Sequence, residues 1–158
     1  MTDTKTAAHR APSSGKSGKV WSDEERAAMQ AAAHERKTAS RRSPVDERAE
    51  GERDIQEKIA GMPEPDRSMA RRVHELILAS VPDLMPKTYY GMPAYAKDGK
   101  TVCFFKPASK FKERYSTLGF EQKANLDEGS MWATSYALTA LTPADEARIV
   151  ELVTRATH

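Results

Sequence analysis

The chain has one cysteine, Cys103, among its 158 residues, so it forms no internal disulfide. Cys103 stands in the apolar run "VCFF" with no base beside it, which predicts a buried, unreactive thiol and not a nucleophile. No stretch approaches the roughly 18 consecutive apolar residues of a membrane span, and the N-terminus lacks the apolar segment of a secretory signal. These absences predict a cytoplasmic protein with no membrane partner.

Motifs for catalysis and metal binding are also lacking. No serine, threonine or cysteine stands in a nucleophile motif, and no glycine-rich phosphate loop is present, so the sequence carries no enzyme signature. The four histidines show no paired ligand spacing, which argues against a transition-metal cage. We interpret His74, which is followed by Glu75, as part of a helix-surface pair and not as a ligand.

Apolar residues are scarce, at 39% of the chain, and they are placed unevenly. Val, Ile, Leu, Phe and Tyr are almost absent before Asp54 and frequent after it. We therefore expect a disordered basic tail over residues 1–21, a charged, alanine-rich helix over 22–38, a polar linker over 39–53 and one folded domain over 54–158. The tail has too little apolar surface to offset the entropy of ordering it.

The first predicted helix begins after Ser22, which forms a capping-box pattern with Glu25. Its apolar content is thin, so we expect it to dock weakly on the domain or to stay apart from it. In the segment that follows, Pro44 and Gly51 predict breaks in regular structure.

Three further helices are predicted within the domain. A short one starts at Asp54 and stops at Gly61, a longer one follows Pro65 and ends before Pro82, and the last begins after the cap Thr142. Each of the two longer helices has one apolar stripe: Met69, Val73, Leu76 and Ile77 in the first, and Ile149, Leu152, Val153 and Ala156 in the second.

The middle of the chain, over residues 88–138, predicts antiparallel strands joined by a two-residue hairpin turn at Asp98-Gly99. Strict alternation from this turn pairs Tyr95 with Val102 and Ala94 with Cys103. Further strands are expected in "RYSTLGF" and "MWATSYALT". Because small residues let helices approach closely, we expect the helices on the face of small residues and an exposed aromatic face opposite. The predicted fold class is α+β, an antiparallel β-sheet with flanking helices mainly on one face.

The segments "YYGMPAYAKDGK", "TVCFF" and "KPASKFKERYSTLGF" resemble the YdhG-like family, small bacterial domains of unknown function. The resemblance covers residues 54–157 and implies an α+β fold without an established catalytic activity. It also implies an iron-chaperone role similar to that of frataxin, which has been proposed for some members. Two positions depart from the family pattern: Phe111 follows Lys110 where many members have histidine, and Tyr90 stands where tryptophan is common.

The main functional hypothesis is a binding module with an aromatic, lysine-rimmed sheet face. An anionic small molecule or a protein partner would bind there, and the same face would also suit a homodimer interface. A solvated hairpin end is the plainer interpretation of its lysines. The predicted ligand-binding residues are Tyr90, Met92, Tyr95, Lys100, Phe104, Lys106, Lys110 and Trp132.

An alternative hypothesis is an iron-handling accessory protein that binds iron through the surface carboxylates Glu121, Asp127 and Glu128. Ordinary solvated acids are the plainer interpretation of these three residues. A remoter alternative is contact with nucleic acid through the basic tail and the lysine hairpin, with aromatic faces for stacking. No cofactor other than iron is expected.

Overall fold

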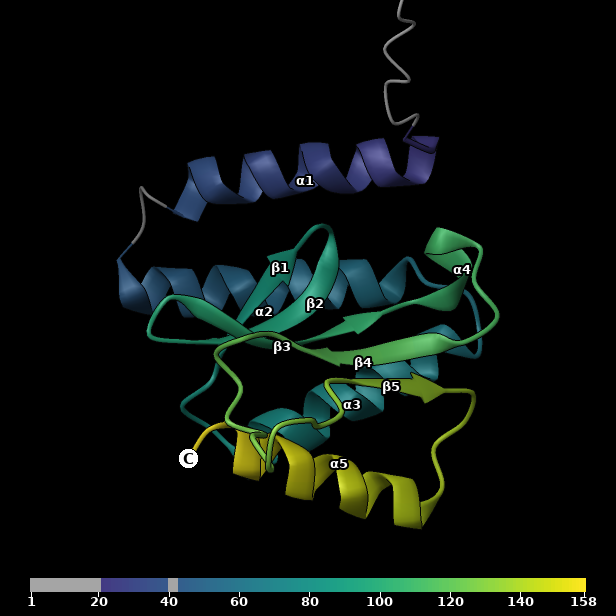
Figure 1. Cartoon of the computed structure of the whole chain (residues 1–158). Helices are drawn as coiled ribbons and strands as arrows, with labels where there is room; N and C mark the ends of the chain where they lie inside the picture. Colours follow the sequence, from purple (N-terminus) through teal and green to yellow (C-terminus); the bar gives the residue numbers. More distant parts are fainter. Residues whose placement is uncertain (1–20, 40–42) are drawn as a thin grey trace, which may run out of the picture.

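The computed structural model describes residues 21–39 and 43–158 and shows an α+β fold (Figure 1). The predicted tail, apart from Trp21, and residues 40–42 lie outside the described part of the chain. The described elements are α1 (Asp23–Ala39), α2 (Pro44–Ala60), α3 (Asp66–Ser80), β1 (Met85–Tyr89), β2 (Met92–Lys97), β3 (Lys100–Lys106), α4 (Ala108–Phe111), β4 (Ser116–Phe120), β5 (Ser135–Leu138) and α5 (Pro143–Ala156).

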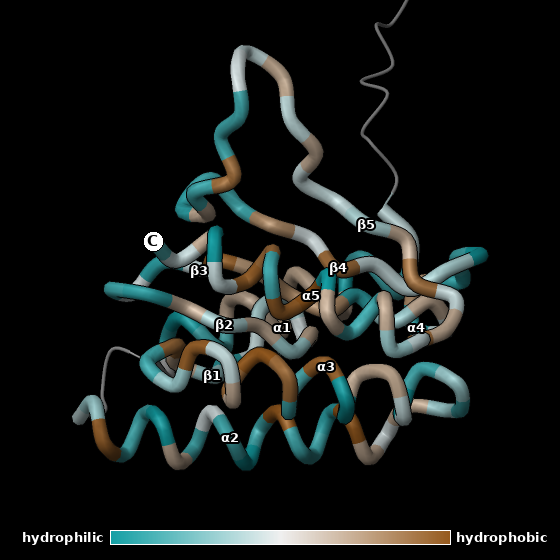
Figure 2. Tube along the Cα trace, turned by 90° about the horizontal axis from the view of Figure 1, so that it is seen from below, coloured by the Kyte–Doolittle hydropathy of each residue, from teal (hydrophilic) through white to brown (hydrophobic). Residues whose placement is uncertain are grey.

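The strands form one antiparallel sheet of five strands in the order β1-β2-β3-β4-β5. Helices α3 and α5 lie on one face of this sheet, α2 runs beside β1, and α1 lies on the opposite side from α3 and α5 (Figure 1). The core lies between the sheet and α2, α3 and α5, where the apolar segments gather in Figure 2. The α+β fold class is confirmed. In the described part of the chain, no helix is long and apolar enough to cross a bilayer.

Helix α2 corrects the prediction of a polar linker over 39–53. Ser43 caps this helix and Pro44 takes its first position, so the proline starts a helix and does not break one. Gly51 lies in the interior of α2, at the point where the helix packs directly on the β1 backbone and leaves no room for a Cβ. A Cβ at Gly51 would lie 2.0 Å from the Pro86 carbonyl oxygen. Residues 44–53 of the predicted linker and the predicted short helix therefore belong to one continuous helix.

Helices α1 and α5 start at their predicted caps. Helix α1 begins at Asp23, and the Ser22 hydroxyl accepts a hydrogen bond of 3.1 Å from the Glu25 N–H. Thr142 and Asp145 form a reciprocal capping box at the start of α5. Local side-chain chemistry fixes these starts, which is why the sequence alone predicts them.

The Asp98-Gly99 turn is confirmed, with φ angles of +52° and +76°. A β-bulge after Tyr95 then shifts the register, so that Tyr95 pairs with Cys103 and Ala94 with Phe104. The predicted partners of Tyr95 and Ala94 on β3 were therefore each wrong by one residue, because a bulge adds one residue to one strand only.

This shift also overturns the predicted facing of the β2 side chains. Tyr95, Cys103 and Phe105 are fully buried in the core that the helices cover. Phe104 lies on the opposite face, where its ring occupies the space that a Cβ of Gly119 would need. The expected packing of helices on the small residues of β2 was therefore wrong, because the large Tyr95 faces the helices; on β3, Cys103 and Phe105 face the helices and Phe104 faces away, as expected.

Cys103 provides a direct test of the core. The thiol is fully buried, and burial raises its pKa from 9.0 to about 12. At pH 8 this lowers its thiolate fraction by about a thousandfold, so we expect a thiol reagent such as Ellman's reagent to leave the native protein unmodified. The same reagent should modify one thiol per chain in guanidinium chloride. Rapid modification of the native protein would contradict the burial of β3.

Candidate functional site

Strands β1 and β2 are joined by a tight turn that the sequence analysis missed. Tyr90 and Gly91 have φ angles of +52° and +76°, the same values as at the Asp98-Gly99 turn. A bulky residue such as tyrosine rarely adopts this left-handed conformation, and such residues concentrate at functional sites. The Tyr90-Gly91 turn therefore directs attention to its surroundings.

A carboxylate is bound at this turn. Glu35 of α1 accepts the Tyr90 backbone N–H on one oxygen at 3.1 Å and the Gly91 N–H on the other at 3.0 Å. Hydrogen bonds from backbone donors to an ionised acceptor are stronger than neutral ones, and two parallel bonds also fix the orientation of the carboxylate. The turn thus presents two adjacent donors in a geometry that suits one carboxylate.

Two lysines add positive charge beside the turn. Lys110 of α4 is half-buried and donates a hydrogen bond to the Gly91 carbonyl at 3.2 Å. Desolvation lowers the pKa of Lys110, the nearby Lys58 ammonium lowers it further, and Glu35 opposes both effects. Two like charges and two backbone donors around one carboxylate favour an anion at this point.

A buried aspartate holds α4, and with it Lys110, in place. Asp66 is 4% exposed and accepts hydrogen bonds from the Ser109 N–H at 2.9 Å and the Ser109 hydroxyl at 2.5 Å. The Ser116 hydroxyl of β4 donates a third bond of 3.1 Å to the same carboxylate. Asp66 therefore ties α4 to the start of α3 and to the sheet.

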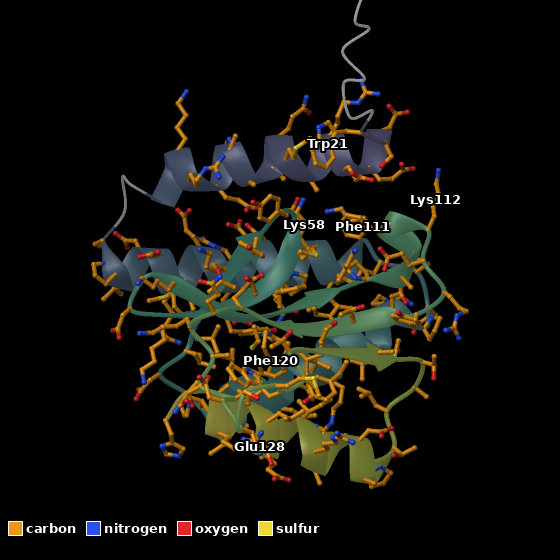
Figure 3. All side chains as sticks on the ribbon, viewed as in Figure 1. Trp21, Lys58, Phe111, Lys112, Phe120 and Glu128 are labelled. Atoms are coloured by element: carbon orange, nitrogen blue, oxygen red, sulfur yellow. The ribbon has the colours of Figure 1, made fainter. Side chains whose placement is uncertain are left out.

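Aromatic rings adjoin the turn on the sheet face opposite α3 and α5. Tyr89 meets Tyr90 edge-on at 4.6 Å between ring centroids and Phe104 at 5.8 Å. The Lys106 and Lys110 ammonium groups lie 4.8 and 5.5 Å from the centre of the Phe111 ring. Figure 3 shows Phe111 and Lys58 on the side of the sheet that α1 occupies. We call the following partly exposed residues the aromatic-lysine surface: Tyr89, Tyr90, Phe104, Lys106, Lys110 and Phe111.

Two cavities flank the turn. One of about 640 Å³ lies between α1, α2 and β1 and reaches Tyr90. The other, of about 530 Å³, lies between the end of α2, the turn and α4, and is lined by Gly91 and Lys110. Both are lined by Glu57 and Lys58, and both have the size of small-molecule sites.

The structure brings together part of the predicted ligand-binding set. Tyr90, Phe104, Lys106 and Lys110 belong to the aromatic-lysine surface, as the contacts above show. Met92 pairs with Tyr89 in the sheet but is only 6% exposed, so it supports the surface from within.

The remaining predicted residues lie elsewhere. Tyr95 is fully buried among the helices, so its placement on the exposed face was wrong. Lys100 is exposed beside Gly99, which lines the larger cavity. Trp132, 37% exposed, belongs to the loop between β4 and β5, which extends away from the sheet in Figure 2.

The predicted iron-binding carboxylates do not form a metal cluster. Glu121 accepts a long hydrogen bond of 3.4 Å from the Tyr89 hydroxyl, whereas Asp127 and Glu128 are exposed in the loop before β5. Within residues 21–39 and 43–158, no group of three or more His, Cys, Asp or Glu side chains could hold a metal ion.

His74 does not form the predicted helix-surface pair with Glu75. The side chain is 4% exposed, its Nε2 lies 2.7 Å from a Glu52 carboxylate oxygen, and its Nδ1 lies 2.8 Å from the Tyr95 hydroxyl. Because the carboxylate accepts, Nε2–H donates to Glu52, and in the neutral ring Nδ1 accepts from Tyr95. Neither cavity described above is lined by these three residues, so we interpret the chain of bonds as a link between α2, α3 and β2.

The Glu52 carboxylate makes this link sensitive to pH. Burial raises the pKa of Glu52, but hydrogen bonds from Gln56 and His74 outweigh it, so the pKa lies below the ordinary 4.5. A lowered folded-state pKa stabilises the fold above pH 4.5, and this contribution is lost as the pH falls through the folded-state value. We expect Glu52→Gln to lose that part of the acid dependence in urea denaturation measured from pH 7 to pH 3. Identical pH profiles of the variant and the wild-type chain would contradict the assignment.

Sequence reasoning missed Glu35, Lys58, Tyr89 and Phe111 as site residues. A Tyr-Gly pair between two apolar segments was the available signal for the turn, although tyrosine is not a typical residue of such turns. Glu35 lies 55 residues before Tyr90 in the sequence, and no local pattern connects the two.

The geometry of the site is the basis for assigning a function to this chain. No family model, no curated protein and no solved structure matches the chain.

Proposed function

We propose that this chain is a binding module that holds an anionic group at the Tyr90-Gly91 turn. The observation that carries the proposal is the Glu35 carboxylate, which accepts one backbone N–H on each oxygen at 3.1 and 3.0 Å. Such donors are part of the rigid backbone, so they need no ordering when a ligand arrives. The turn is in this respect similar to the backbone sites that capture terminal carboxylates in other proteins.

The surroundings of the turn support recognition over chemistry. Lys58 and Lys110 supply charge, while Tyr89, Tyr90 and Phe104 supply ring faces and edges. Cations, backbone donors and aromatic rings form the composition of a site that selects an anion with an apolar part. We therefore propose the same ligand class as before, an anionic molecule or a protein partner. The proposed binding site is now the Tyr90-Gly91 turn and no longer the sheet face as a whole.

We also propose that the chain belongs to the YdhG-like family. Its most specific motif, "YYGMPAYAKDGK", covers the whole of β2 together with the turns at both of its ends. The motif thus coincides with the part of the chain that builds the proposed site.

Nuclear magnetic resonance of the full chain tests the proposal. In a ¹⁵N-labelled Glu35→Gln variant, sodium acetate, succinate and phosphate are titrated in turn while the Tyr90 and Gly91 amide signals are followed. We expect saturable shifts of both amides with at least one of these anions, because the substitution removes the resident carboxylate charge.

A pair of lysine variants provides the control. Lys110→Met, added to Glu35→Gln, should weaken anion binding about fivefold or more, since it removes a partly desolvated cation. Lys123→Met removes an equal charge whose ammonium lies 3.9 Å from Asp98, and it should leave binding unchanged. Absence of saturable shifts with all three anions, or equal effects of both lysine substitutions, would contradict the proposal.

The iron-handling alternative can be examined in the same sample. Anaerobic ferrous iron would broaden the signals of Glu121, Asp127 and Glu128 if those carboxylates bind it. Broadening confined to these three residues, and removed by their conversion to amides, would favour the alternative over anion binding.

A further inference from the structure

The face of α1 that docks on the domain has a regular composition. Glu24 and Glu35 are eleven positions apart, about three helical turns, so they lie on the same face of the helix at a distance of roughly 16 Å. Between them, Ala28 and Ala32 lie on that face and are each 5% exposed. The docking face is therefore a strip of small residues with a carboxylate at each end.

Each of these two carboxylates has a receptor on the domain. Glu35 is bound by the Tyr90-Gly91 turn, and the Glu24 carboxylate lies 2.6 Å from the Lys112 ammonium. Lys112 follows α4 with a φ angle of +54°, and Figure 3 shows its side chain pointing towards the N-terminal end of α1. The domain thus offers two anion contacts at the spacing of three helical turns.

The rest of the α1 contact is thin. Among its described residues, only Ala28 and Ala32 are buried, while the larger Met29 is 36% exposed and Trp21, just before the helix, is 39% exposed. Alanine side chains bury little apolar area, so most of the specificity of docking comes from the two carboxylates. A second helix with the same two charges and larger apolar side chains would make a better contact with the aromatic-lysine surface.

We propose that the surface under α1 is a receptor for an acidic helix of a partner protein, and that α1 is its intramolecular competitor. The inference rests on the proposed function, because it names a helix with two carboxylates as the anionic ligand of the same turn. A single small anion cannot reach both the turn and Lys112, whereas a helix with acidic residues eleven positions apart reaches both.

The chain connection makes α1 an effective competitor. The segment between Ala39 and Pro44 is short, so α1 is present at a high effective concentration, on the order of millimolar for short linkers. A partner helix therefore binds the wild-type chain more weakly than a chain whose own α1 has lost its two carboxylates.

A fluorescent peptide with the sequence of residues 21–39 is the probe. Its anisotropy is measured against the full wild-type chain and against the full Glu24→Gln/Glu35→Gln variant, each confirmed as folded by circular dichroism and by its melting temperature. We expect the variant to bind the peptide at least tenfold more tightly than the wild-type chain does. A matched chain, Asp23→Asn/Glu25→Gln, loses the same charge from the same helix and should behave as the wild type.

The peptide and the receptor are then altered separately. A peptide with glutamine at both docking positions should lose binding to the double variant, and Lys112→Met in the double variant should weaken binding of the unaltered peptide. No binding of the peptide at millimolar concentration, or binding that does not depend on Glu24 and Glu35 of the peptide, would overturn the inference. If anions still shift the Tyr90 and Gly91 amides in that case, the proposed function stands and only the helical ligand is rejected.

Discussion

Asp66→Ala is expected to lower the free energy of unfolding by about 3 kcal/mol, since it leaves the Ser109 N–H, the Ser109 hydroxyl and the buried Ser116 hydroxyl without their charged acceptor. The same substitution should release α4 from the sheet and so disorder Lys110 at the candidate site. Urea denaturation at pH 7 measures the first effect. The second should be visible as weaker anion binding in the Glu35→Gln background.

Asp66→Asn is the matched control for this variant. The amide keeps one oxygen acceptor in the same place, so its loss of stability should be smaller than that of Asp66→Ala. Equal losses below about 1 kcal/mol for both variants would show that the Asp66 network is not what holds α4, since a typical net hydrogen bond is worth that much.

Gly51→Ala is expected to destabilise the protein by about 2 kcal/mol, although alanine favours an isolated helix by about 1 kcal/mol over glycine. The reason is steric: the new Cβ would lie 2.0 Å from the Pro86 carbonyl oxygen, so α2 must move away from β1. Thermal and urea denaturation measure the change.

Gly61→Ala, just after the end of α2, controls for replacing a glycine by alanine where the new Cβ meets no close contact. A Cβ at Gly61 meets the Lys58 carbonyl oxygen at 3.6 Å, an ordinary contact, and the φ angle there is −81°. This variant should change stability by less than about 0.5 kcal/mol. A Gly51→Ala chain as stable as wild type would contradict the close packing of α2 on β1.

Much of the fold could be predicted because its signals are local. Ser22 and Thr142 cap their helices through their own side chains, and Asp98-Gly99 forms a hairpin turn because both residues tolerate positive φ. The apolar stripes of α3 and α5 follow from helical periodicity. These features depend on residues within a few positions of one another.

The errors come from contacts between distant segments. From the local sequence alone, Gly51 predicts a break in regular structure. In the fold, a glycine stands at this position of α2 because Pro86 of β1 approaches the helix closely there. The bulge after Tyr95 puts this side chain on the other face of β2 than strict alternation predicts, and no local sequence signal indicates the extra residue. A shift of one residue was enough to move Tyr95 from the expected surface into the core.

The candidate site shows the same division. Tyr90, Phe104, Lys106 and Lys110 were predicted because they lie in one short stretch of the sequence around β2 and β3. Glu35 was not, since only the docking of α1 brings its carboxylate to the turn. Helix α1 buries few residues on the domain, but its carboxylates give the contact a specificity that composition alone does not reveal.

Amide hydrogen exchange at Tyr90 and Gly91 tests most directly whether this turn is an anion site. The two amides should exchange at least about tenfold faster in Glu35→Gln than in the wild-type chain, as expected for the loss of hydrogen bonds to a charged acceptor. The Gly99 amide, in a turn with the same φ angles, should be unaffected. Equal exchange rates of the Tyr90 and Gly91 amides in both chains would show that the turn does not hold the carboxylate, and the account of the site would be wrong.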